Sequence, residues 1–290
     1  NTLASGDILT IYDHGDADNN TYNLTDTTFQ RTAAGTATGT VTYATVETVN
    51  LNAGTGGDDI NVLDTADSVN TNVNANSGND DIDVTTTGTS SSVVINGQAG
   101  SDAIDILTTG TGSFVQVNGG TENDVVTQRN SGPASRIQLN GDAGTDTINV
   151  WAGNATSLTD INGGANTDTV NIGSPANTVD GVLGNVFVAG DAHDAGNTSL
   201  TIRTNTNTLA SGDILNINDQ GDAGSYTNTL AATTFTRTGT GTVTYLTVET
   251  VNINASQGAA NFDVNDTADS VNTTITTQDQ ADDVDITTTG

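Results

Sequence analysis

Aspartate recurs every 22 residues through the middle of the chain. Apolar residues stand two and four positions after it in most periods, and a second apolar pair follows eleven residues later. Because alternate residues of a strand point to the same face, each period predicts two short strands with one apolar face each. A fixed period of this length is typical of stacked repeats. The recurring residue is aspartate, which occurs every 22 residues at Asp58, Asp80, Asp102, Asp124, Asp146 and Asp168.

This period predicts an all-β fold: a flattened parallel β-solenoid, of the β-helix or β-roll kind, with 22 residues and two strands per coil. If each period makes one coil, equivalent residues stack in columns and two parallel sheets face each other. The alternative is an antiparallel sandwich of the immunoglobulin kind, which also has short strands with turns about every 8–12 residues. A sandwich gives no reason for equal loops or for aspartate at one phase. One inward column is therefore expected at Val73, Ile95, Val117, Leu139 and Ile161.

A longer repeat overlies the short one, since residues 1–88 match residues 207–290. The offset is 206 residues at the start and 202 residues later. We expect one continuous solenoid segment over 1–290: irregular coils with an acidic loop (1–48), regular 22-residue coils (49–172), an irregular insert (173–206) and the second copy (207–290). Neither end changes composition as a capping unit would. This predicts a piece of a longer array and self-association into a filament or sheath.

The net charge limits the kinds of partner that the chain is expected to bind. Five arginines face 35 acidic residues, for a net charge of −30. This balance excludes nucleic acids and anionic membrane surfaces as partners and favours cations or simple solubility. No run approaches the ~18 apolar residues of a membrane helix, so no membrane insertion is expected. The absence of cysteine fits an extracellular or cell-surface location.

Two motifs give the chain a family resemblance. Gly-x-x-Gly-x-Asp-x-Ile-x-Ile occurs at 97–106, with a close variant at 141–150, and the phrase at 41–51 is followed by a Gly-rich turn at 54–60. The arrangement resembles giant repetitive bacterial surface proteins with haemolysin-type calcium-binding (RTX-like) repeats. The resemblance implies an extracellular protein with an adhesive or structural role. The departure is that RTX repeats have a period of nine residues with Gly-Asp turns on both edges, whereas here the half-coil is 11 residues and only one edge carries the motif.

The aspartate column, Asp58 to Asp168, is the first candidate site. Stacked ~4.8 Å apart, neighbouring carboxylates would repel by roughly 0.9 kcal/mol in water and ~3.5 kcal/mol at an effective dielectric of about 20. Calcium between coils would offset this repulsion because it accepts six to eight oxygens. Glycines such as Gly78 and Gly100 would let backbone carbonyls turn toward the ion. In the alternative, each carboxylate accepts turn amides and faces solvent.

Acidic loops are the second candidates for a cation. Aspartates spaced by two or three can wrap an ion, although none of these loops matches the EF-hand pattern. The alternative is an ordinary solvated turn. The predicted metal ligands are Asp13, Asp16 and Asp18, with Asp219/Asp222 and Asp191/Asp194 as further pairs.

An asparagine column ends the second strand of each period. Stacked side-chain amides can hydrogen-bond along an axis, as in amyloid ladders, so a structural role is favoured over sugar binding. The members of this predicted ladder are Asn52, Asn74, Asn96, Asn118, Asn140 and Asn162.

The sequence does not predict an enzyme. The two histidines, His14 and His193, lie far apart, and no cysteine nucleophile or Gly-x-Ser-x-Gly elbow is present. The prediction is an extracellular structural repeat protein that forms a stalk, fibre or surface layer, stabilised by calcium. One alternative is an adhesin that binds a surface or glycan through 173–206 or the acidic loops. A less favoured alternative is a polysaccharide-active β-helix enzyme.

Overall fold

The computed structural model describes residues 6–33, 35–191, 212–278 and 280–289. These residues form strands joined by turns and contain no helix. Accordingly, no helix in this part of the chain is long and apolar enough to span a membrane. Of the residues named above, Asp194 and His193 lie outside the described residues, as does the side chain of Asp191.

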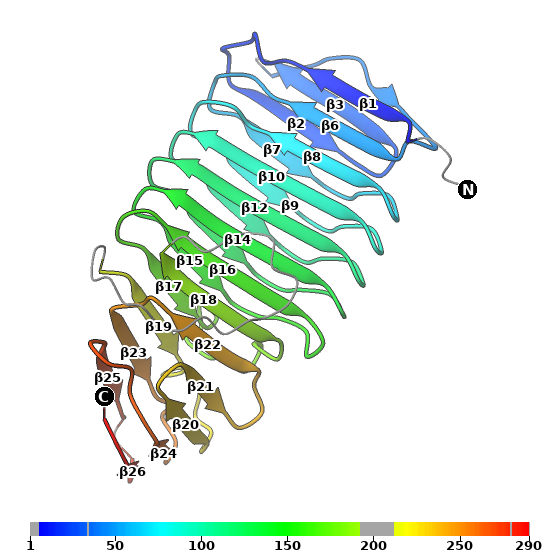
Figure 1. Cartoon of the computed structure of the whole chain (residues 1–290). Helices are drawn as coiled ribbons and strands as arrows, with labels where there is room; N and C mark the ends of the chain where they lie inside the picture. Colours follow the sequence, from blue (N-terminus) through cyan, green and yellow to red (C-terminus); the bar gives the residue numbers. More distant parts are fainter. Residues whose placement is uncertain (1–5, 34, 192–211, 279, 290) are drawn as a thin grey trace.

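Two sheets of stacked strands face each other along the molecule (Figure 1). Sheet A contains, in spatial order, β1 (Ile8–Tyr12), β6 (Thr48–Asn52), β8 (Asn70–Asn74), β10 (Ser92–Ala99), β12 (Phe114–Thr121), β14 (Arg136–Ala143), β16 (Leu158–Gly164), β18 (Asn185–Asp191), β22 (Thr242–Leu246), β21 (Thr234–Arg237), β20 (Thr227–Ala231), β24 (Asn261–Val264) and β26 (Asp283–Ile286). Sheet B contains β25 (Asn272–Thr276), β23 (Thr250–Asn254), β19 (Ile214–Asn218), β17 (Thr169–Ile172), β15 (Thr147–Val150), β13 (Val125–Gln128), β11 (Ala103–Ile106), β9 (Asp81–Val84), β7 (Asp59–Val62), β2 (Asn20–Leu24), β3 (Thr28–Ala33) and β4 (Thr36–Ala37), with β5 (Val41–Thr42) paired to β3.

The regular region is a parallel solenoid, which confirms the predicted fold and not the antiparallel sandwich. Each strand pairs with the strand one coil away, in parallel and with a shift of 22 residues. Val93 lies opposite Val115, and Ile95 lies opposite Val117. The same register holds in sheet B, where Ile104 lies opposite Val126.

The core is a thin layer of aliphatic side chains between the two sheets. The predicted inward column of sheet A is confirmed, because every member is 0% exposed: Val73, Ile95, Val117, Leu139 and Ile161. Sheet B contributes the facing column, of which Ile60, Ile82 and Ile148 are also fully buried. Burial of one such side chain stabilises the fold by about 1.5–3 kcal/mol relative to exposure.

The two copies of the longer repeat depart from the parallel pattern at the same place. In the first copy β2 pairs antiparallel with β3. In the second copy β20, β21 and β22 form an antiparallel run within sheet A. The 22-residue period does not predict these hairpins, because the segments that form them lie outside the regular coils.

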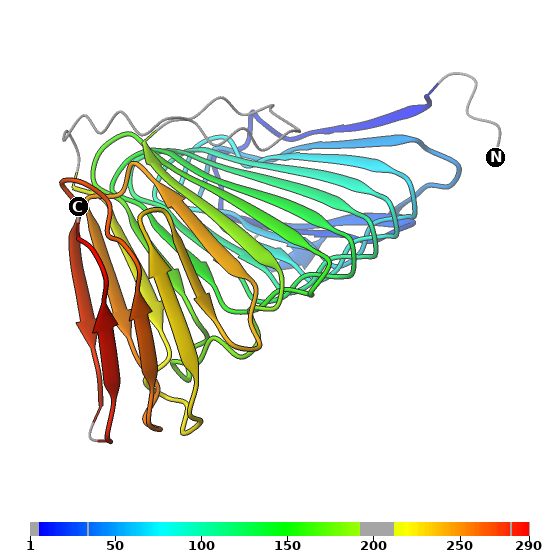
Figure 2. The ribbon, with the colours of Figure 1, turned by 60° about the horizontal axis from the view of Figure 1, so that its bottom comes forward.

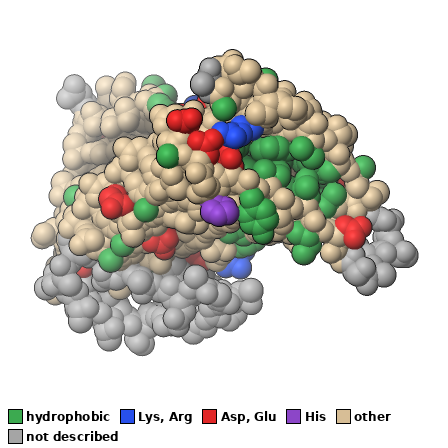
Figure 3. All heavy atoms as spheres, turned by 90° about the horizontal axis from the view of Figure 1, so that it is seen from above, with side chains coloured by type: hydrophobic (Ala, Val, Ile, Leu, Met, Phe, Trp, Pro, Cys, Tyr) green, Lys and Arg blue, Asp and Glu red, His purple; other side chains and the backbone are tan. Residues whose placement is uncertain are grey.

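The coils rotate progressively along the axis. In Figure 2 the last strands, β24 to β26, run steeply relative to the first strands of the chain, as the twist of β-sheets predicts. Figure 3 looks onto the end that carries β1, where apolar side chains gather in a patch. Ile8, Tyr12 and Val41 are the large apolar residues of this region that are more than a third exposed.

Candidate functional site

The predicted aspartate column forms a continuous ladder of hydrogen bonds. Each aspartate stands directly before or at the start of a strand of sheet B, and its Oδ1 accepts the backbone N–H of the equivalent aspartate one coil earlier. The N···O distances from Asp58 to Asp168 are 2.7–2.8 Å. The ladder extends at both ends, because Asn20 N–H donates to Asp58 and Asp168 N–H donates to Asp213, each at 2.8 Å. We call Asp58, Asp80, Asp102, Asp124, Asp146, Asp168 and Asp213 the carboxylate ladder.

The ladder side chains are buried, which differs from the solvent-facing alternative considered above. The six aspartates from Asp58 to Asp168 are 1–2% exposed. The second carboxyl oxygen, Oδ2, has no hydrogen-bond partner within the described structure at Asp80, Asp102, Asp124 and Asp146. The ladder therefore provides one satisfied and one unsatisfied carboxyl oxygen in each of these coils.

The first glycine of the repeated motif makes room for the unsatisfied oxygen. A Cβ atom on Gly97 would lie 2.3 Å from Asp102 Oδ2 and 2.4 Å from the carbonyl oxygen of Gly119 in the next coil. The same clash would arise at Gly119, where the added atom would lie 2.4 Å from Asp124 Oδ2. The spacing Gly-x-x-Gly-x-Asp thus places a carboxyl oxygen and a carbonyl oxygen of the following coil against one glycine.

Burial changes the acidity of the ladder. It raises the pKa of Asp80 and Asp124 to about 7 and the pKa of Asp102 and Asp146 to about 6. Removal of the charged form from water is the largest cause, and the hydrogen bond from a backbone N–H opposes it only in part. Burial also raises the pKa of Asp58.

The ladder carboxylates by themselves are not grouped around one point. Calcium takes six to eight oxygens around one point, whereas ladder carboxyls stand one coil apart and each uses one oxygen on a backbone N–H. Within the described residues no three His, Cys, Asp or Glu side chains are grouped to hold a metal ion. Calcium binding by this protein stays a prediction.

The predicted asparagine ladder is present in sheet A. The side-chain amide of each residue donates to Oδ1 of the equivalent residue one coil earlier, from Asn74 to Asn52 at 3.0 Å and from Asn140 to Asn118 at 2.8 Å. Asn162 lies in register with Asn140 at the end of this column. The intermediate distances, for Asn96 and Asn118, are 2.9 and 2.7 Å.

A further asparagine ladder, not expected from the sequence, lies on sheet B. Asn171 donates to Asn149, Asn216 to Asn171 and Asn252 to Asn216, at 2.8–3.0 Å. It crosses from the regular coils into the second copy of the longer repeat. Its signal in the sequence is the asparagine at the centre of Thr147–Val150 and Thr169–Ile172.

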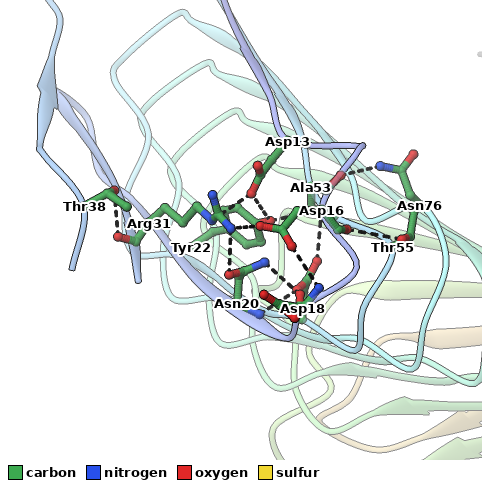
Figure 4. A network of polar contacts seen from close by, with 12 residues as sticks. Asp13, Asp16, Asp18, Asn20, Tyr22, Arg31, Thr38, Ala53, Thr55 and Asn76 are labelled. Carbon is green, nitrogen blue, oxygen red and sulfur yellow. Dashed lines mark hydrogen bonds and ion pairs between the residues drawn. The ribbon is translucent and has the colours of Figure 1, made fainter. Parts of the chain in front are cut away.

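The acidic loop at the start of the chain contains its own cation (Figure 4). Arg31, from β3, lies 2.8 Å from Asp13 and forms an ion pair with Asp16. Asp18 does not pair with the arginine; its backbone N–H donates to Asp16 Oδ1 at 2.9 Å. The structure thus brings Asp13 and Asp16 together as predicted, but around a guanidinium group.

The second copy repeats this arrangement in a more buried form. Arg237 lies 2.9 Å from Asp219 and 2.8 Å from Asp180, and also pairs with Asp222. Its side chain is 1% exposed, against 21% for Arg31. Sequence analysis missed both arginines, although they correspond at the 206-residue offset of the longer repeat.

The chain was compared with known proteins. It matches no protein-family model, no curated protein and no solved structure.

Proposed function

We propose that the chain is a structural repeat protein that forms a rigid rod within an extracellular stalk, fibre or surface layer. The observation that supports this most directly is that three kinds of hydrogen bond follow the same axis. Within the regular coils, the backbone ladders, the carboxylate ladder and the asparagine ladders all connect one coil to the next at a 22-residue step. A pull along the axis would load all of them together, so the arrangement suits a load-bearing element.

The surface composition supports the same proposal. A net charge of −30 keeps such rods soluble and separate along their sides. The extracellular location rests on the absence of cysteine and on the resemblance to RTX-like surface proteins. Labelling of intact source cells with an antibody against the chain, and loss of the label after external protease, would test that location.

No observation within the described residues favours the adhesin or the enzyme. Phe187, which the adhesin would present on its surface, is half-buried in β18. His193 and most of the predicted insert lie outside the described residues. Neither alternative gains a specific supporting contact.

Force spectroscopy tests the proposed function. Thirteen strands at ~4.8 Å give a rod roughly 60 Å long, which small-angle X-ray scattering should show in solution. Pulled along its axis, the chain should lose coils in successive steps of roughly 75 Å, the extended length of 22 residues. Unfolding in a single low-force event would contradict a load-bearing role.

A further inference from the structure

One glutamine interrupts the aliphatic core of the regular coils. In sheet B, every other inward residue of the described strands from β7 to β17 is isoleucine or valine. Gln128, at the end of β13, stands in the inward column between Ile106 and Val150 and is 0% exposed. A carboxamide in such a place destabilises the fold unless both of its ends have hydrogen-bond partners.

A threonine of the opposite sheet supplies one of these partners. Oε1 of Gln128 accepts the hydroxyl hydrogen of Thr159, in β16, at 2.9 Å, and Nε2 donates to the carbonyl oxygen of Ala152 at 2.9 Å. Thr159 is 2% exposed and stands in the inward column of sheet A between Ile137 and Val186. The two polar side chains therefore satisfy each other across an otherwise aliphatic core.

Other buried polar contacts recur from coil to coil. In the turns that follow the strands of sheet B, Thr65 Oγ1 lies 3.3 Å from Ser91 Oγ, and Ser131 Oγ lies 2.7 Å from Ser157 Oγ. Both pairs span 26 residues, so coils that exchanged partners would keep contacts of this kind. The Gln128–Thr159 pair has no second example in the described coils from β7 to β17 and therefore distinguishes one coil from the others.

Equal coils leave the order of stacking open while the solenoid forms. Because equivalent inward residues recur every 22 residues, β12 can pair with β16, and β13 with β17, if the coil that contains β14 and β15 loops out. Closure of the longer loop adds little entropic cost. A skipped coil loses its own burial, so this arrangement is a kinetic trap and not a second native state, and mispairing of this kind is a characteristic failure of repeat proteins.

We propose that the Gln128–Thr159 pair is a register lock, which prevents the coil of β14 and β15 from being skipped during folding. With that coil skipped, the columns would set Gln128 against Val186 and Thr159 against Ile106. Each polar group would then be buried without its partner, which is strongly unfavourable. A single buried polar residue fixes the register of coiled coils in the same way. This inference concerns folding and does not depend on the proposed rod.

Disulfide trapping during refolding reads the register, and the natural chain has no cysteine to interfere. On the outer face of sheet B, Val125 lies opposite Thr147, which lies opposite Thr169. Directly paired residues fall within the Cα separation of about 4.4–6.8 Å that a disulfide spans, whereas residues two coils apart, at ~9.6 Å, do not. V125C/T147C should therefore link in the native register, and V125C/T169C should link only where a coil has been skipped.

Replacement of the pair by aliphatic residues should open the skipped register. With the natural core, V125C/T169C should stay unlinked during refolding from urea under mild oxidation. With Gln128→Leu and Thr159→Val added, the same two cysteines should link about tenfold more or better, because the skipped register no longer buries an unpaired polar group. Linking that stays as rare as with the natural core overturns the lock.

Urea unfolding separates the lock from a simple gain of stability. Gln128→Leu or Thr159→Val alone leaves one buried group without its partner and should lower the urea midpoint, whereas the double variant should recover it. A double variant that no longer unfolds cooperatively would make the pair a requirement for stability and would overturn the lock.

Thr71→Val is the matched control. Thr71 is 2% exposed and stands in the same inward column as Thr159, in coils whose inward residues in sheet B are aliphatic. Its replacement should leave V125C/T169C unlinked during refolding. A rise in linking equal to that of the double variant would assign the effect to any buried threonine and not to the pair.

Discussion

The backbone N–H of Asp102 donates to Oδ1 of Asp124 in the next coil at 2.8 Å. The carboxyl of each coil therefore satisfies a backbone donor in the coil before it, as an N-cap side chain satisfies a helix. The other oxygen of Asp124 is buried without a partner. This combination fixes the side chain in place and leaves its charge poorly solvated, which couples the stability of the solenoid to pH.

The free energy of unfolding is expected to fall as pH rises from about 4 to about 8. The folded-state pKa is raised to about 7 at Asp124 and to about 6 at Asp102, chiefly by burial, against about 4 in an unfolded chain. The stabilisation that these two carboxyl groups contribute to the folded state is therefore fully present below about pH 4 and is lost as pH rises through 6 to 7. Urea denaturation at several pH values measures this loss, which is expected to be roughly 3–4 kcal/mol per ladder carboxyl, since one pKa unit corresponds to about 1.4 kcal/mol.

Asp124→Asn separates this effect from the general charge of the chain. Asparagine keeps an oxygen for the N–H of Asp102 and removes the ionisable group, so the variant should show a shallower pH dependence and higher stability at about pH 8. Asp59→Asn, on the exposed face, removes the same formal charge and should leave the slope nearly unchanged. A slope that is equal in Asp124→Asn and wild type would contradict the buried titration.

Most of the fold could be predicted from the 22-residue period and from the alternation of apolar residues within each strand. The i, i+2 apolar pairs predicted which residues of each coil point inward, and Val117 and Leu139 lie where they were expected. The stacking of Asn118 on Asn96 was also predicted, because equal phase in a solenoid means equal position. The period could not show that Asp124 is buried, because burial at that edge depends on how the turn of the next coil folds over the side chain.

Asn118→Ala is expected to destabilise the solenoid by about 1–3 kcal/mol, because it removes two inter-coil hydrogen bonds and leaves Oδ1 of Asn96 without its donor. Asn61→Ala is the matched control. The amide of Asn61 donates only within its own coil, to Asp59 at 2.9 Å, so its loss should cost less than about 0.5 kcal/mol. Thermal or urea unfolding of both variants measures the difference. Equal destabilisation would show that the asparagine ladder does not contribute to stability.

Arg237→Met is expected to be strongly destabilising, by about 3–5 kcal/mol, because it leaves the carboxylates of Asp219 and Asp222 without their buried cation. Arg129→Met is the matched control, since Arg129 is 45% exposed and pairs with a single carboxylate, Asp105. Exposed ion pairs of that kind contribute about 1 kcal/mol or less. If the two variants unfold at the same urea concentration, the buried cluster is not a stability element.

The sequence could not predict that arginine side chains pair with the acidic loops. Asp13 and Asp16 are spaced like ligands of a cation, and that spacing alone cannot distinguish an ion from a guanidinium group. The decision depends on β3 folding back antiparallel on β2, which carries Arg31 to the loop. A hairpin outside the 22-residue period gave no periodic signal from which this contact could be inferred.

In contrast to the sequence pattern, the geometry of the carboxylate ladder predicts that removal of calcium leaves the thermal unfolding midpoint of the wild-type chain unchanged at neutral pH. The ladder carboxyls each use one oxygen to accept a backbone N–H, and Arg31 already pairs with Asp13 and Asp16 of the first acidic loop. Scanning calorimetry with a chelator and with added calcium checks this. A midpoint that falls with chelator in wild type but not in the double variant Asp102→Asn, Asp124→Asn would show that the ladder holds calcium.

Arg31→Met is expected to give the chain a response to added calcium that the wild type lacks. Without the guanidinium group, the carboxylates of Asp13 and Asp16 repel each other, and two adjacent anionic groups favour either a proton or a bound cation. The variant should therefore be less stable than wild type and should regain part of its midpoint in added calcium, whereas the wild type should not respond. A magnesium titration separates a specific response from ionic screening, because Mg²⁺ gives up its waters reluctantly and demands near-octahedral geometry. Equal recovery in both ions would mean that the loop responds only to ionic strength.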